Sequence, residues 1–289
     1  MKFATDAERQ TFERVVKELP GLVKDRCQGY DELYGHQIIP GEYYDEPIAQ
    51  ALVYKFCKAY GFQYEEAVAN LCDTLNWRRE FKPLSCAFRE KHNELLDHVG
   101  ILANYAADTA GAAPNKKVVT WNLYGELLKH KEIFVDTESF LRYRVGLMEK
   151  GLQLLDFTDD TNDYMTQVHD YKGVSMWKMD PQIKKCTKSV IEVFQKYYPE
   201  LLYAKYFVNV PSLLTWVYDV VKKFVSEETR KKFVVLNDGA KLGVYLGNAP
   251  SNNYGGKSTQ LLSEQNVADV RPSRYASYLL EREITTEVD

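Results

Sequence analysis

Apolar residues in the first ninety or so positions recur at helical spacing. From residue 6 to residue 25 they stand three and four apart, at Phe12, Val15, Val16 and Leu19. Pro20-Gly21 is expected to close this first helix. Residues 48–62 repeat the period up to Gly61, and residues 64–81 place one apolar stripe on a third helix. The pattern therefore predicts a small helical module over residues 1–95.

Beyond residue 95 the pattern changes to strands that alternate with helices. Strand-like stretches are expected at residues 116–126, 164–173, 204–211 and 231–237, with a further short element at 240–247. Between them lie amphipathic or apolar helical stretches at residues 136–157, 180–200 and 212–225, and the tail shows one short helical run. Such alternation is typical of an α/β sheet with helices on its faces. Residues 96–289 are therefore predicted to form a second, α/β domain, which makes the whole chain α/β (α+β).

Composition narrows the class of protein. The chain has 289 residues, 45% of them apolar, and a net charge of -4, which gives no electrostatic footprint for nucleic acid. No run of 18 apolar residues is present, and the amino terminus lacks the apolar core of a signal peptide. The five cysteines are odd in number and widely spaced. A reducing compartment is expected, either the cytosol or the cytosolic face of a membrane.

Four separated blocks of the sequence resemble the CRAL-TRIO family of lipid-binding proteins. Residues 52–81 are similar to its helical amino-terminal signature and keep the ending Trp77-Arg78, although Tyr60-Gly61 replace the customary basic pair. The family's D-x-K-G strand end is matched by residues 170–173, its YPE helix–strand unit by residues 198–211, and its FGG by residues 254–256. The blocks stand in the family's order and cover residues 52–258.

This resemblance implies a helical amino-terminal module followed by a lipid-binding domain whose mixed β-sheet floors an apolar cavity. By motif the chain is most similar to fungal phosphatidylinositol/phosphatidylcholine transfer proteins, which carry a guest and perform no chemistry on it. The resemblance implies that Glu200 and Lys232 hold the phosphatidylinositol head group. Taken alone, these residues equally suit a turn and a solvated basic run.

Residues 212–225 resemble the mobile gate helix of the same family. One face of this stretch is apolar and Lys222-Lys223 lie beyond it, a pattern that suits transient contact with a membrane surface. A plain core helix has a similar pattern.

Two polar residues interrupt the predicted cavity strand. Alternation along a strand places His169 and Tyr171 on one face, where lipid-carrying members of the family typically have apolar residues. Burying two unpaired polar groups would cost about 1–3 kcal/mol each. They are therefore expected to bond each other or buried water, or to bind a guest. Tyrosinate is an axial ligand of ferric haem, and a neighbouring histidine would help to stabilise the deprotonated phenol.

The His-x-Tyr pair is similar to that of the haem-binding branch of these fungal proteins. The resemblance implies ferric haem b, with Tyr171 as the iron ligand and His169 as its partner. It also implies that Tyr64 lies near the iron and that Arg144 and Lys205 pair with the haem propionates. From the residues alone, Arg144 would be a helix-surface charge and Lys205 a structural lysine.

Three hypotheses follow from these patterns. The first is a non-enzymatic haem-binding phosphatidylinositol transfer protein in the cytoplasm, in peripheral contact with the endoplasmic reticulum or other membranes. The second is an ordinary phosphatidylinositol transfer protein without haem, and the third is a haem-dependent redox enzyme. No distal acid–base pair for the third is recognisable in the sequence. The oligomeric state stays open.

Overall fold

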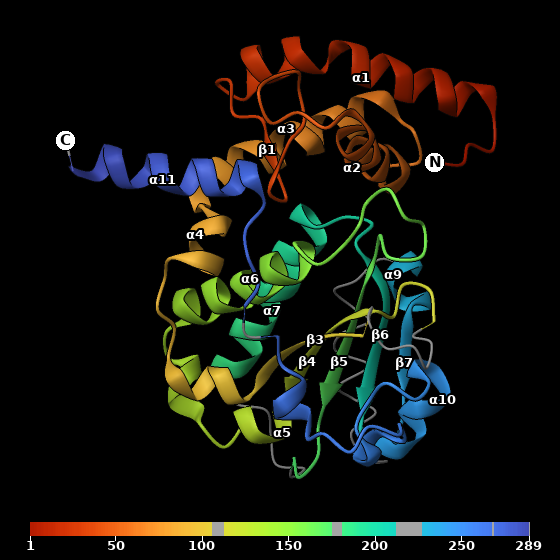
Figure 1. Cartoon of the computed structure of the whole chain (residues 1–289), viewed down its shortest axis with the longest axis vertical. Helices are drawn as coiled ribbons and strands as arrows, with labels where there is room; N and C mark the ends of the chain where they lie inside the picture. Colours follow the sequence, from red (N-terminus) through yellow and green to blue (C-terminus); the bar gives the residue numbers. More distant parts are fainter. Residues whose placement is uncertain (106–112, 175–180, 212–226, 268, 289) are drawn as a thin grey trace.

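Four helices and a two-stranded β-hairpin form the amino-terminal part of the chain, at one end of the molecule (Figure 1). The computed structural model describes residues 1–105, 113–174, 181–211, 227–267 and 269–288. The elements of this part are α1 (Asp6–Arg26), β1 (Glu32–Leu33), β2 (His36–Gln37), α2 (Glu46–Ala59), α3 (Tyr64–Phe81) and α4 (Pro83–Phe88). Helices α1, α2 and α3 pack against one another around a shared apolar core. The predicted helical module is therefore present.

Helix α1 continues past Pro20 to Arg26, so the prediction that Pro20-Gly21 would end it is wrong. Proline lacks the N–H that would bond to the preceding turn, which weakens a helix locally. The turn beyond Pro20 nevertheless buries Val23 against the same core that takes Leu19. Packing of this last turn overrides the local preference that the sequence pattern reports.

A five-stranded mixed sheet forms the centre of the remaining chain, in the order β3-β4-β5-β6-β7. Its strands are β3 (Gly100–Asn104), β4 (Val118–Leu123), β5 (Met165–Asp170), β6 (Leu202–Val208) and β7 (Phe233–Val235). Strands β3 and β4 are antiparallel, and the other neighbours are parallel. The predicted α/β fold and mixed sheet are confirmed, although β3 was not predicted.

Helices lie against one face of the sheet and short turns and helices cover the other. On the first face, α6 (Thr137–Leu152) and α7 (Pro181–Tyr197) share an apolar cluster with Tyr171 and Phe207. On the second face, Trp121, Val168 and Tyr206 pack against α10 (Gly243–Leu246) and the turn before it. The short helices α5 (Tyr124–Leu127) and α9 (Glu227–Lys231) follow β4 and precede β7.

The carboxyl-terminal tail returns to the amino-terminal part of the molecule (Figure 1). It forms helix α11 (Arg274–Val288), longer than the short helical run predicted from the sequence. Tyr275 donates a hydrogen bond to Asp31, and Ala276 is buried against Leu84 of α4. Both ends of the chain therefore contribute to the same end of the molecule.

Two predictions concern segments of the chain that could meet a membrane. The predicted gate helix, residues 212–225, lies outside the described residues. Among the helices that the structure describes, none is long and apolar enough to cross a bilayer.

Candidate functional site: a polar-floored cavity under α6 and α7

A cavity of about 1310 Å³ opens between the sheet and helices α6 and α7. Its floor comes from β5 and β6, one wall from α7, and part of its rim from the end of α2. The predicted residues that line it are His169, Tyr171, Arg144, Lys205, Glu200 and Lys232. Six of the seven predicted site residues, spread over almost ninety positions, therefore meet in one space.

His169 and Tyr171 both face this cavity, as strand alternation predicts. The register of the parallel strands brings Phe207 of β6 beside His169. The Tyr171 ring stacks on the Tyr124 ring at 5.5 Å with an interplanar angle of 7°, and the His169 ring lies 4.9 Å from Tyr124. The two polar side chains thus stand in an aromatic setting on the cavity floor.

The two floor residues are uncharged in this setting. Burial raises the pKa of the Tyr171 phenol far above its usual range, and nearby Tyr124 adds to the effect. Burial lowers the pKa of His169, and the positive charges of Lys205 and Arg144 lower it further. The buried Nε2 of His169 has no hydrogen-bond partner in the described part of the chain. A hydrogen bond between His169 and Tyr171, one of the alternatives considered above, is not present there.

Arg144 and Lys205 bring two basic side chains to the same cavity from different elements. Arg144 projects from α6 and is 4% exposed, and its Nε is buried without a partner among the described residues. Lys205 projects from β6, with its Nζ 5.5 Å from the Phe207 ring centroid. Burial lowers the pKa of Lys205 to about 7, helped by the charge of Arg144.

Tyr64 is the one predicted residue that the structure places elsewhere. It begins α3, donates a hydrogen bond to Glu18, and has the Arg14 guanidinium 3.7 Å above its ring. It does not line the cavity, so its predicted place beside the iron is corrected. The aromatic next to Tyr171 is Tyr124, which the sequence reasoning missed. The sequence carried no local signal for this contact, because Tyr124 follows Leu123 at the end of β4, and only the pairing of Leu123 with Asp170 of β5 brings it beside Tyr171.

Glu200 and Lys232 meet at the rim of the cavity. Lys232 Nζ lies 3.6 Å from Glu200 Oε1, and Lys58 Nζ of α2 lies 3.1 Å from Glu200 Oε2. The Tyr164 hydroxyl donates a 3.1 Å hydrogen bond to the same Oε2. Burial alone would raise the pKa of Glu200, but the charges of Lys232 and Lys58 and these hydrogen bonds lower it. The rim therefore presents one carboxylate between two lysines.

The backbone of Glu200 is fixed by Lys55, a second lysine of α2. Glu200 has a positive φ of 51°, a conformation that costs a non-glycine residue about 1–3 kcal/mol. Lys55 Nζ donates to the Glu200 carbonyl at 3.3 Å and to Asp163 at 3.0 Å, and lies over the Tyr164 ring. Burial lowers the pKa of Lys55 to about 8, although Asp163 opposes the shift. The helical module thus helps to shape the rim.

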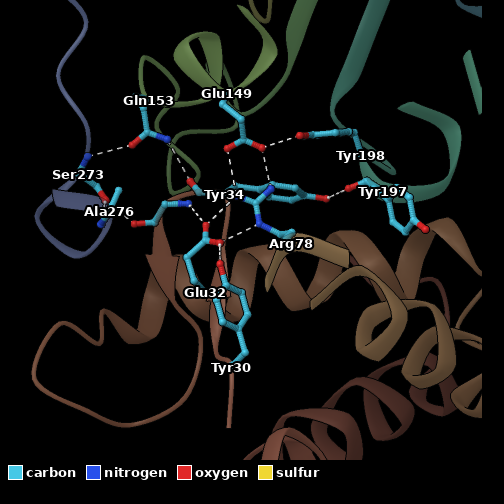
Figure 2. Close-up of polar contacts among 11 residues, drawn as sticks. Tyr30, Glu32, Tyr34, Arg78, Glu149, Gln153, Tyr197, Tyr198, Ser273 and Ala276 are labelled. Atoms are coloured by element: carbon cyan, nitrogen blue, oxygen red, sulfur yellow. Dashed lines mark hydrogen bonds and ion pairs between the residues drawn. The ribbon is translucent and has the colours of Figure 1, made fainter. Parts of the chain in front are cut away.

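A buried ion-pair network holds the segment just before Glu200 (Figure 2). The Tyr198 ring lines the cavity, and its hydroxyl donates a 2.6 Å hydrogen bond to Glu149. Arg78 of α3 bonds Glu149 on one side and Glu32 on the other, with all three side chains fully buried.

Among the described residues, no group of three or more His, Cys, Asp or Glu is arranged to hold a metal ion.

A cavity between a mixed sheet and two helices, with a helical module at its rim, is the kind of concave site in which proteins bind small molecules. Residues 111–256 match the CRAL/TRIO domain, and the chain belongs to this family. It is 58% identical, over the whole of both chains, to the phosphatidylinositol transfer protein SFH5 of Saccharomyces cerevisiae, and 56% identical to that of Candida glabrata. A crystal structure of Sfh5 superposes with a TM-score of 0.95 at 58% identity, covering 99% of this chain and all of the other.

Proposed function

We propose that this protein is a non-enzymatic haem-binding member of the phosphatidylinositol transfer family. In this proposal ferric haem b lies in the cavity with Tyr171 as its tyrosinate ligand. The observation that carries it is the pair of buried polar groups, Tyr171 and His169, which lie among aromatic rings on the cavity floor and have no hydrogen-bond partner among the described residues for the Tyr171 hydroxyl or for His169 Nε2. The protein would work in the cytoplasm, in transient peripheral contact with the endoplasmic reticulum or other membranes.

The donor set of the cavity fits a haem. The Tyr171 hydroxyl makes no hydrogen bond with a described residue, and a phenolate oxygen is an accepted ligand of ferric iron. Because burial holds the phenol neutral, only a strong neighbouring positive charge would release its proton. His169 is placed to hydrogen-bond on the same floor, and Arg144 and Lys205 suit two carboxylates. When bound, the haem would supply a Lewis-acidic ferric centre.

An absorption spectrum tests the haem proposal. Protein purified from haem-replete cells is expected to be coloured, and Tyr171→Phe to lose most of the haem or to shift the charge-transfer bands of a tyrosinate complex. Tyr206→Phe is the matched control, because Tyr206 is a buried tyrosine on the other face of the same sheet. A colourless wild type, or Tyr171→Phe with full haem and an unchanged spectrum, would overturn the proposal.

The rim supports binding and transfer of phosphatidylinositol as part of the same proposal. The relatives are named as phosphatidylinositol transfer proteins, and the implied head-group residues meet at the opening, with Lys232 Nζ 3.6 Å from Glu200 Oε1. Inositol hydroxyls require acceptors such as the Glu200 carboxylate, and a phosphate favours charged donors such as Lys232. The rim therefore offers both kinds of group at the place where a head group would sit.

Exchange of labelled lipid between vesicles tests this part. Glu200→Gln combined with Lys232→Met is expected to abolish phosphatidylinositol exchange, since the acceptor and the cation are both removed. Lys185→Gln serves as control, because Lys185 lines the cavity from α7 without an ion pair to Glu200. Unaltered phosphatidylinositol exchange in the double variant would show that the head group binds elsewhere.

A further inference from the structure

Asp170 stands between the two floor residues and reaches the second face of the sheet. Its carboxylate is 4% exposed and makes no ion pair with a described residue. The backbone N–H of Lys172 and Nδ2 of Asn209 each donate to Oδ1 at 2.8 Å, and the Tyr254 hydroxyl donates to Oδ2 at 2.6 Å. A buried carboxylate without a cation is costly unless its oxygens are hydrogen-bonded, so this carboxylate clamp determines where Asp170 lies.

The donors of the carboxylate clamp belong to three different segments. Lys172 is in the turn that follows β5, Asn209 directly follows β6, and Tyr254 ends the short turn at residues 252–254. Asn209 has a positive φ of 54°, and its Oδ1 accepts a 2.7 Å hydrogen bond from the Gly239 backbone N–H beyond β7. The Tyr254 ring packs on Trp121, with 4.6 Å between the ring centroids. The end of β5 is therefore fixed by residues that do not line the cavity.

The place of the Tyr171 phenol depends on this strand end. The Tyr171 hydroxyl makes no hydrogen bond with a described residue, so no such bond at its tip orients the ring. Its backbone N–H donates to the Val208 carbonyl at 3.0 Å. A Cβ on Gly125 would stand 1.9 Å from the Lys172 carbonyl oxygen, so only glycine lets this turn lie against the residue after Tyr124. The stacking of Tyr171 on Tyr124 is therefore set by backbone contacts around the turn, and the carboxylate clamp anchors that turn.

We propose that Asp170 and Tyr254 are positioning residues, which hold the Tyr171 phenol in place against Tyr124. This role rests on the proposed function, in which the phenolate oxygen must meet ferric iron at a fixed place. Groups that orient a metal ligand without touching the metal change metal affinity by about 10–100-fold when they are removed. The place of the phenol can also be measured without haem, so the carboxylate clamp and the iron site are tested separately.

Nuclear magnetic resonance of the haem-free protein, with isotope-labelled tyrosine, tests the carboxylate clamp. The Tyr171 resonance is assigned by its loss in Tyr171→Phe, and its shift depends on the stacked Tyr124 ring. Tyr254→Phe removes only the hydroxyl that bonds Asp170 and is expected to move or broaden the Tyr171 resonance. Tyr245→Phe is the matched control, because Tyr245 packs on the same face and its hydroxyl makes no hydrogen bond with a described residue. An unmoved Tyr171 resonance in Tyr254→Phe would overturn the proposal.

Asp170→Asn separates the geometry of the carboxylate clamp from its charge. The amide oxygen can accept the two bonds that Oδ1 accepts now, and the amide nitrogen can donate to the Tyr254 hydroxyl. This variant is therefore expected to keep the Tyr171 resonance and the haem affinity of the wild type. Tyr254→Phe is expected to fold, because the family's FGG motif has phenylalanine at this position, and to lower haem affinity about tenfold with shifted charge-transfer bands. Equal loss of haem in the two variants would show that charge rather than position matters and would overturn the proposal.

The outcomes separate the carboxylate clamp from the iron site. A wild type that never binds haem, with the Tyr171 resonance displaced in Tyr254→Phe, would refute the iron site and support the holding of the phenol by Asp170 and Tyr254. A wild type that binds haem, with that resonance unmoved in Tyr254→Phe, would refute the positioning residues alone.

Discussion

At the scale of single residues, the charge state of Lys205 links ligand binding to pH. Its pKa is lowered to about 7 by burial and by the charge of Arg144, so above pH 7 the free protein holds it mainly as a neutral amine. The titratable groups that face it are Arg144 of α6 and His169 of β5, and the pKa of His169 is itself lowered by burial. A bound carboxylate would favour the charged amine and raise its pKa towards the ordinary value of about 10.4.

We therefore expect carboxylate binding to take up a proton at pH 8.5. The free site lacks this proton there and the bound site holds it, so affinity falls as pH rises above 7 and is level below it. Calorimetry with protoporphyrin IX, in two buffers of different ionisation enthalpy, is expected to show uptake of about one proton at pH 8.5 and almost none at pH 6. Lys205→Met should abolish the uptake. Uptake of the same size in Lys205→Met would assign the proton to another group.

At the scale of secondary-structure elements, much of the fold could be predicted from the sequence. For these elements the spacing of apolar residues and the residues that end each stretch indicate the same bounds. Helix α3 begins and ends where the apolar stripe of residues 64–81 predicts, and β4 and β5 fall within their predicted stretches. The pattern of apolar residues failed where contacts with other elements of the chain determine the local structure. The turn of α1 beyond Pro20 depends on a core built by α2 and α3, and β3 is an edge strand held by β4.

The site residues differ in the same way: local patterns predict some of them, and others depend on contacts between residues far apart in the sequence. His169 and Tyr171 could be placed on one face because alternation is a local property. Tyr124 and Lys58 could not, because their distances to Tyr171 and Glu200 depend on strand register and on how α2 meets the sheet. Resemblance alone placed Tyr64 near the iron, whereas the packing of α1 on α3 holds it against Glu18.

At the scale of the whole molecule, one buried network joins the helical module to the cavity. Arg78 belongs to α3 and Glu32 to β1, whereas Glu149 belongs to α6 and its partner Tyr198 lines the cavity (Figure 2). The neighbouring segment is held in the same way, because Tyr34 donates to the Tyr197 carbonyl at 2.7 Å and Trp77 stacks on the Tyr197 ring. The helical module therefore holds the residues just before Glu200 in place, and it also packs against the α/β domain.

Removing Arg78 is expected to destabilise the whole molecule. Arg78→Met leaves Glu32 and Glu149 buried without their cation, which should lower the free energy of unfolding by about 3–5 kcal/mol. Arg79→Met is the matched control at the next position, where the partly exposed pair with Glu80 contributes about 1 kcal/mol or less. Denaturant unfolding measures both. Because buried carboxylates without a cation have a raised pKa, the deficit of Arg78→Met should shrink as pH falls towards 5. Equal stability of the two variants at pH 7 would mean that the network does not hold the module to the cavity.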